Sequence, residues 1–173
     1  MLYYEKMILK IWVYLEMTSL DEKDRKILEL LQENALTPVA EIAAKVGLST
    51  TPCWRRIQKL EEEGIIRKRV ALLDRHKLNV GVTVFVAVKA KRHAVDWLNE
   101  FKRAVENIPE IVEAYRLSGE VDYLLRVVVP DIAGYDTVYK RLIEKVEFND
   151  VSSSFAMEDM KFTTSLPLKY LGN

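Results

Sequence analysis

A short stretch in the N-terminal half, residues 45–60 (KVGLSTTPCWRRIQKL), restricts the possible folds of this chain more than any other. Gly47 predicts the end of one helix, because only glycine reverses the chain with a positive φ at little cost. Ser49 and Pro52 predict the start of the next helix, since serine is a good N-cap and proline is tolerated in a first turn. The stretch therefore predicts two helices joined by a tight turn.

The second of these helices has one apolar face and one polar face. Its apolar residues recur at i, i+4 and i+7, a spacing that buries a single stripe: Cys53, Ile57 and Leu60. The opposite side carries Thr51, Arg55, Gln58 and Lys59, and residues 45–60 include four basic residues and no acidic one. Such a face near a helix N-terminus suits the phosphates and base edges of DNA. A merely solvated basic face is the alternative interpretation.

Composition limits the functional classes. The formal net charge is zero, which excludes a wholly basic nucleic-acid coat and requires any DNA site to be a local patch. The single cysteine, Cys53, excludes an internal disulfide and a multi-cysteine zinc site. The sequence has no nucleophile elbow, phosphate-binding loop or metal-spaced cluster, and His76 and His93 stand isolated in polar segments. We therefore expect no catalytic residue, no metal and no cofactor.

The residues before this stretch predict two further helices. A first helix is expected over 21–34, with either Ser19 or Asp21 as its N-cap. A second is expected to open at Thr37 and Pro38, with threonine as N-cap and proline in the first helical position. Three helices with short connections, the last two across a glycine turn, predict a helix-turn-helix.

A basic segment follows the third helix. Residues 65–73 predict a strand-turn-strand with Arg67, Lys68 and Arg69 at its tip. Such a hairpin is either a wing over the DNA backbone or a solvated turn. Residues 74–79 then form a short polar hinge.

Beyond the hinge the pattern changes from helical spacing to strands. Strands are expected near 80–89, 111–117, 123–129 and 151–160, and helices over 94–107 and 131–146. The order βαββαβ is the ferredoxin-like arrangement, so the fold class is α+β. Four strands with helices on one face leave an apolar face uncovered, which predicts a homodimer.

The first residues, 1–17 (MLYYEKMILKIWVYLEM), do not match this plan. Their apolar run is too short to span a bilayer and lacks the cleavage site of a secretory signal. We interpret them as a start-site extension or a loosely packed helix. An amphipathic arm used in assembly is the alternative.

Four motifs together resemble the Lrp/AsnC (feast/famine) family of transcription regulators: LDEKDRKILELLQEN, VGLSTTPCWRRIQKLEEEGII, LSGEVDYLL and MEDMKFTTSLPL. The resemblance covers about residues 20–168. It implies an N-terminal winged helix-turn-helix over 18–73, a RAM-type effector-binding and dimerisation domain over 80–166, and a tail over 167–173. It also implies homodimers that often form octamers or larger assemblies, an amino acid effector, double-stranded DNA as partner, and a cytoplasmic, nucleoid-associated protein with no membrane role.

The resemblance assigns DNA contacts to the third helix. Thr51, Arg55 and Gln58 point away from the core and are expected to face base edges. Phosphate contacts, which position the protein without reading sequence, are expected from Ser49, Thr50, Arg56 and Lys59. Trp54 is expected to pack at the dimer or wing boundary rather than to lie against a sugar.

The resemblance places the effector near the turn between the second and third strands. Asp122 is expected to accept the ammonium of an amino acid, and N–H groups near Ser118 and Gly119 to bind its carboxylate. Leu117, Ile132 and Phe155 are expected to select its side chain, although all three are also typical of an ordinary core.

Two other functional classes share parts of this pattern. One is an enzyme with the same two-domain fold, similar to the sirohaem decarboxylases. The other is an amino-acid-binding assembly protein without a DNA role. The basic residues of the third helix argue against both, because neither class needs them.

Overall fold

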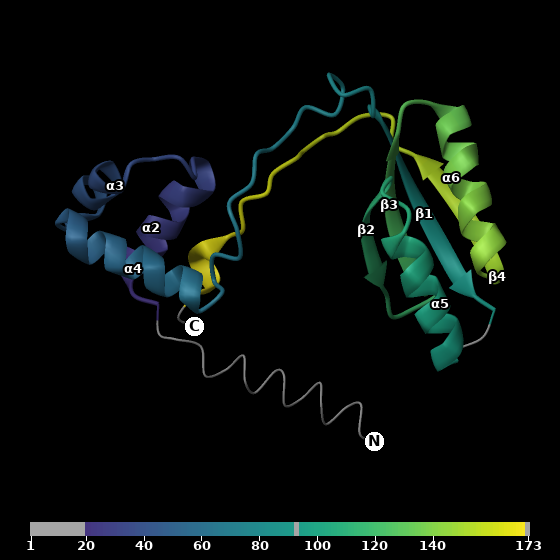
Figure 1. The fold of residues 1–173 in the computed structure, drawn as a ribbon, viewed down its shortest axis with the longest axis horizontal. Helices are drawn as coiled ribbons and strands as arrows, with labels where there is room; N and C mark the ends of the chain where they lie inside the picture. Colours follow the sequence, from purple (N-terminus) through teal and green to yellow (C-terminus); the bar gives the residue numbers. More distant parts are fainter. Residues whose placement is uncertain (1–19, 92–93, 172–173) are drawn as a thin grey trace. The chain divides into compact units, whose positions relative to one another are not determined.

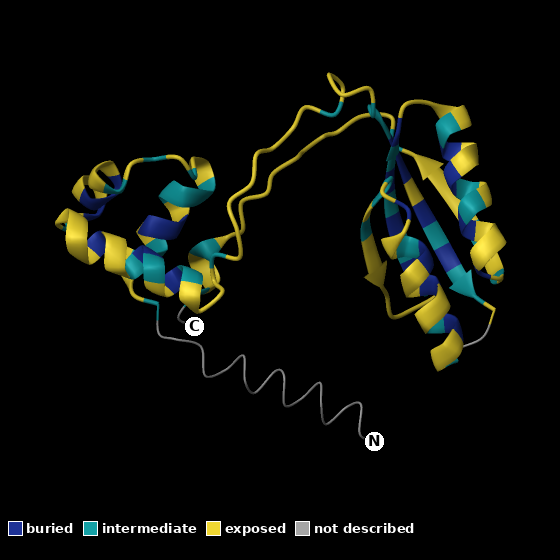
Figure 2. Cartoon of the chain, in the orientation of Figure 1, coloured by how far each residue is buried: buried dark blue, intermediate teal, exposed yellow. Residues whose placement is uncertain are grey.

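The computed structural model describes residues 20–91 and 94–171 of the 173 residues. The chain divides into two compact units: one combines the residues up to Ala71 with the C-terminal segment from Phe162, and the other is Leu72–Lys161. Figures 1 and 2 show the course of the chain and the burial of its residues. The predicted extension 1–17 and His93 lie outside the described residues.

Three helices form the N-terminal unit: α2 (Glu22–Glu33), α3 (Val39–Val46) and α4 (Thr50–Glu62). Asp21 caps α2 through a capping box with Asp24, so the second of the two predicted caps is the one used. Pro38, not Thr37, stands at the N-cap position of α3. The predicted threonine cap is wrong because the Thr37 hydroxyl donates back to the Asn34 carbonyl at 2.8 Å.

The core of this unit confirms the stripe expected on α4. Cys53, Ile57 and Leu60 are buried, and they share one apolar cluster with Ile27 of α2 and Ile42 of α3. Burial raises the pKa of the Cys53 thiol, so this cysteine is a small buried hydrophobic residue rather than a reactive group. The turn before α4 has the predicted geometry, with Gly47 left-handed at φ 66°.

The C-terminal segment is also part of this unit. Leu168, in the short 3-10 helix η1 (Leu168–Tyr170), packs against the helical core together with Leu171. The Gln32 side chain bonds both backbone groups of Leu166: its amide donates to the carbonyl at 3.2 Å and its oxygen accepts from the N–H at 2.6 Å. The segment expected to be a separate tail therefore completes the helix-turn-helix unit.

The expected hairpin at residues 65–73 is absent. The structure assigns no strand to this segment, and Val70, Leu72 and Leu73 are exposed. An isolated two-stranded hairpin is marginal in water unless one face packs on something. Only Ile66 of this segment packs against the helical core, which explains why the strands do not form. Arg69 instead turns back to Glu61, at 2.9 Å.

The predicted hinge, 74–79, is an ordered turn. Asp74 accepts the backbone N–H groups of His76 and Lys77 through its Oδ1, at 2.9 and 3.3 Å. Asn79 is left-handed at φ 57°, a conformation that asparagine tolerates better than most residues. The turn belongs to the second compact unit and leads into its first strand.

The second unit has the predicted βαββαβ order. Its elements are β1 (Val82–Ala90), α5 (Val95–Glu106), β2 (Ile111–Arg116), β3 (Tyr123–Val129), α6 (Ile132–Lys145) and β4 (Phe148–Phe155). The strands form one antiparallel sheet in the order β2-β3-β1-β4, with both helices on one face (Figure 1). The last strand begins and ends earlier than the predicted 151–160.

The two faces of the sheet differ in chemistry. Alternate residues of β1 and β3, such as Val86 and Leu125, are buried beneath the helices (Figure 2). The uncovered face carries Phe85 and its cross-strand partner Arg126, whose guanidinium bonds Glu113 at 2.5 Å. The register also places Ser152 and Ser154 of β4 on this face. The expectation of an apolar face is therefore only partly right.

Candidate functional site

Most of the outward face of α4 is exposed, and Gln58 on this face is half-buried. Thr51 and Arg55 lie on this face, and in the described part of the chain neither has a side-chain hydrogen bond or ion pair. Lys59 is 62% exposed, and its ammonium lies 3.7 Å from the Glu63 carboxylate, one turn further along the helix. Exposed pairs of this length hold a side chain only weakly. Thr51, Arg55 and Lys59 are therefore available to a ligand.

The first turn of α4 offers a second kind of group. Ser49 stands at the N-cap position as predicted, but its hydroxyl makes no bond to the helix. Ser49 and Thr50 are both exposed. The first N–H groups of a helix have no partner within it, and together with the helix dipole they favour an anion. This end of α4 can therefore accept a phosphate from both hydroxyls and backbone.

Gln58 is less free than expected. Its amide donates to Glu61 at 3.2 Å, and the same glutamate holds Arg69 at 2.9 Å. The sequence alone did not reveal this arrangement because Arg69 was expected at a hairpin tip. Gln58 can reach a base edge only by leaving Glu61.

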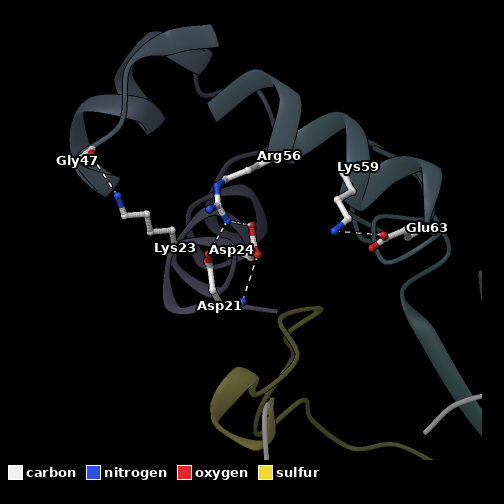
Figure 3. Close-up of polar contacts among 7 residues, drawn as sticks. All are labelled: Asp21, Lys23, Asp24, Gly47, Arg56, Lys59 and Glu63. Carbon is white, nitrogen blue, oxygen red and sulfur yellow. Dashed lines mark hydrogen bonds and ion pairs between the residues drawn. The ribbon is translucent and has the colours of Figure 1, made fainter. Parts of the chain in front are cut away.

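Arg56 points toward the start of α2, where Asp21 and Asp24 lie (Figure 3). Its Nη1 lies 2.7 Å from Asp21 Oδ2 and 2.8 Å from Asp24 Oδ1, and its side chain is 33% exposed. The hydrogen bond with Asp24, followed by that with Asp21, raises the pKa of the guanidinium. The structure therefore joins Arg56 to the start of α2, whereas Lys59 extends toward Glu63 at the end of α4 (Figure 3).

The packing expected for Trp54 at the dimer or wing boundary stays a prediction. The Trp54 side chain is 50% exposed, next to Arg55 on α4. Sequence reasoning also missed the two aspartates that hold Arg56. Their spacing, i and i+3 at a helix start, indicates a capping box, and nothing local to it points to a partner on another helix.

The predicted effector residues at the β2–β3 turn are close together. Ser118 and Gly119 are exposed, and Gly119 has φ 131°, which side chains other than hydrogen rarely allow. Asp122 is built into the sheet: its Oδ2 accepts the Ala90 N–H at 2.9 Å, and its own N–H donates to the Val88 carbonyl at 3.1 Å. The Asp122 carboxylate therefore closes the end of β1 in this structure.

The remaining predicted effector residues lie elsewhere. Phe155 pairs with Val84 near the start of β1, and Ile132 follows the end of β3. The turn with Leu117 lies at the other end of β3, roughly 20 Å away at about 3.3 Å per residue. Within one protomer, Leu117 and the turn cannot share a pocket with Ile132 and Phe155.

Two further features bear on function. Among the described residues, no group of three or more His, Cys, Asp or Glu side chains is arranged to hold a metal ion. In the same part of the chain, no helix has the length and apolar character needed to cross a membrane.

Comparisons with known proteins match both units. The family model described as winged helix-turn-helix DNA-binding matches residues 20–67, and the model for the Lrp/AsnC ligand binding domain matches residues 83–166. The crystal structure of an AsnC family transcriptional regulator from Agrobacterium tumefaciens is similar, with a TM-score of 0.85 and 62% identity, covering 87% of this chain and 99% of that one.

Two relatives extend the comparison. The glutamate uptake regulatory protein of Zymomonas mobilis is 48% identical over 87% of this chain and 92% of its own length. A transcriptional regulator of Neisseria meningitidis, solved as a complex with L-Met, has a TM-score of 0.83 and 38% identity, covering 88% of this chain and 99% of that one. These matches identify a transcription regulator rather than an enzyme. The chain belongs to the Lrp/AsnC family of DNA-binding transcription regulators.

Proposed function

We propose that α4 enters the major groove of double-stranded DNA and reads its sequence. The observation that carries this proposal is the division of α4 into a buried apolar stripe and an exposed face on which Arg55 has no carboxylate partner in the described chain. An unpaired guanidinium is suited to bidentate contact with guanine O6 and N7. Thr51 contacts a base edge beside it, and Gln58 does so after leaving Glu61.

Phosphate contacts come from the ends of this surface. Ser49 and Thr50 supply hydroxyls at the N-terminus of α4, and Lys59 supplies a weakly held ammonium. Each phosphate contact raises affinity for every sequence alike, because phosphates carry no base information. DNA binding places the protein in the cytoplasm on the nucleoid.

The protein acts as a homodimer through the uncovered sheet face, and dimers associate further into octamers or larger assemblies. Phe85, Leu124 and Val128 alternate onto this face and supply apolar contact area. Arg126 and Glu113 are already paired with each other, so a second copy can cover them without leaving an unpaired charge. Phe85→Glu should therefore shift the dimer toward monomer in light scattering.

The effector is an amino acid, bound where the β2–β3 turn of one copy meets another copy. The Neisseria relative, solved with L-Met, supports the ligand class. The roughly 20 Å between the turn and Phe155 supports a site shared between copies. A shared site lets the ligand favour one assembly over another, which is the differential affinity that any effect on DNA binding requires.

Selection from random duplexes tests the DNA-reading proposal, because the operator is unknown. The selected duplex and a scrambled control are compared by fluorescence anisotropy over a range of salt concentrations. We expect the selected site to bind at least about a thousandfold more tightly than the scrambled one. Equal affinity for both duplexes at every salt concentration would refute sequence reading by α4. Calorimetry with the twenty amino acids on the same protein tests the effector class.

A further inference from the structure

We propose that Arg56 is a positioning residue that sets the orientation of α4, and not a phosphate contact. It acts through the two carboxylates that also cap α2. This inference rests on the proposed reading of DNA by α4. It changes the role of the second arginine in the sequence Trp-Arg-Arg, where the first faces DNA and the second faces the protein.

Each of the two carboxylates accepts one hydrogen bond from the α2 N-terminus and one from Arg56 on α4. Asp21 accepts the Asp24 N–H through Oδ1 at 2.9 Å and the Arg56 guanidinium through Oδ2. Asp24 accepts the Asp21 N–H through Oδ2 at 3.2 Å and the same guanidinium through Oδ1. All four carboxylate oxygens are therefore used, two by the capping box and two by Arg56.

A phosphate would have to compete with both carboxylates for this arginine. Both bonds are made by one nitrogen, Nη1, at 2.7 and 2.8 Å, and the Asp24 side chain is only 14% exposed. Departure of Arg56 would leave two neighbouring carboxylates without their cation, one of them largely buried, and such a loss is costly. The two unpaired carboxylates would also repel the incoming phosphate, because all three groups are negatively charged.

A second contact from the same turn of α2 reaches the turn just before α4. The Lys23 ammonium donates to the Gly47 carbonyl at 3.4 Å, in the left-handed turn that precedes α4 (Figure 3). The first turn of α2 thus contacts both the chain entering α4 and the side chain of Arg56 within it. Because successive helical residues are turned by 100°, fixing Arg56 also fixes the direction of Arg55.

Asp24→Asn should change DNA affinity in opposite directions, depending on whether Arg56 positions α4 or contacts a phosphate. If Arg56 positions α4, loss of its carboxylate partner should weaken binding to the selected duplex by on the order of three- to tenfold. If Arg56 contacts a phosphate, the same change removes a competitor for it and should tighten binding. Glu22→Gln is the matched control: it neutralises one acid of the same turn, but Glu22 bonds Lys26 within α2, at 2.9 Å. We expect little change in specific affinity for the control.

The salt dependence of binding supplies an independent readout. Loss of a phosphate contact lowers the slope of log affinity against log salt by about 0.9. We expect Arg56→Gln to weaken specific binding more than non-specific binding and to leave the slope unchanged, whereas Lys59→Gln should lower the slope. Arg56→Lys keeps the charge and should recover part of the lost specificity.

The outcomes are distinct. Tighter binding by Asp24→Asn, or a slope lowered by about 0.9 in Arg56→Gln, would overturn the positioning role. Failure of the unmodified protein to prefer its selected site would instead refute the proposed function itself. Thermal melting checks that each variant is folded at the assay temperature. If Asp24→Asn is not folded, the slope of Arg56→Gln decides alone.

Discussion

Leu168→Ala tests whether the C-terminal segment stabilises the DNA-binding unit. Leu168 is partly buried against the helical core. Full burial of a leucine is worth about 1.5–3 kcal/mol, and the cavity left by alanine adds to the loss, so a partly buried leucine corresponds to about 1–2 kcal/mol. A small unit loses about 4–8 °C in Tm per kcal/mol. We therefore expect the melting midpoint of the DNA-binding unit to fall by roughly 5–15 °C in Leu168→Ala.

Hydrogen exchange read by mass spectrometry separates this effect from the rest of the chain. Exchange in α2 should accelerate in Leu168→Ala, while exchange in β3 should not change, because β3 belongs to the other compact unit. Leu166→Ala is the matched control: its side chain is 72% exposed, and only its backbone bonds Gln32. Unchanged α2 exchange in Leu168→Ala, or equal acceleration in the control, would refute the packing argument.

Three further predictions concern binding and assembly. Arg55→Ala should cost on the order of 1–3 kcal/mol of specific affinity and relax preference at one base position, and undiminished affinity at matched salt would remove Arg55 from base reading. Residues 18–173 alone should fold, dimerise and bind DNA, because the caps and core pattern begin near Asp21; a shift to monomer in light scattering would contradict this. Asp122→Asn keeps an oxygen for the Ala90 N–H but loses the charge. Calorimetry should therefore show weaker amino-acid binding, whereas DNA binding without the amino acid should not change. Equal amino-acid binding by Asp122→Asn and the unmodified protein would exclude Asp122 from the site.

The local elements of both units follow from the sequence alone. The buried stripe of α4 comes from a spacing of i, i+4 and i+7, and the left-handed turn before it from Gly47, since both depend on neighbours within a few residues. Strands β1 and β3 of the second unit follow from runs rich in valine, and the order of strands and helices restricts the topology to few possibilities. These features were predicted because their causes are local.

Partners that lie far apart in the sequence came only from the tertiary structure. Arg56 was expected at a phosphate with Lys59, but its partners, Asp21 and Asp24, lie more than thirty positions away on another helix. The pairing of Gln32 with Leu166 spans 134 positions, and no local pattern indicates it. An exposed basic side chain and one paired across helices look identical in a periodicity analysis.

The candidate effector site shows the same division. The sequence predicted the turn at Ser118–Asp122 from its glycine, whereas the roughly 20 Å between this turn and Phe155 became visible only in the tertiary structure. The two strands expected within residues 65–73 are missing for a related reason, because strand propensity produces a hairpin only where one of its faces can be buried. Side-chain spacing along the chain determines the helices and strands, whereas packing between distant segments decides which polar groups are left for a ligand.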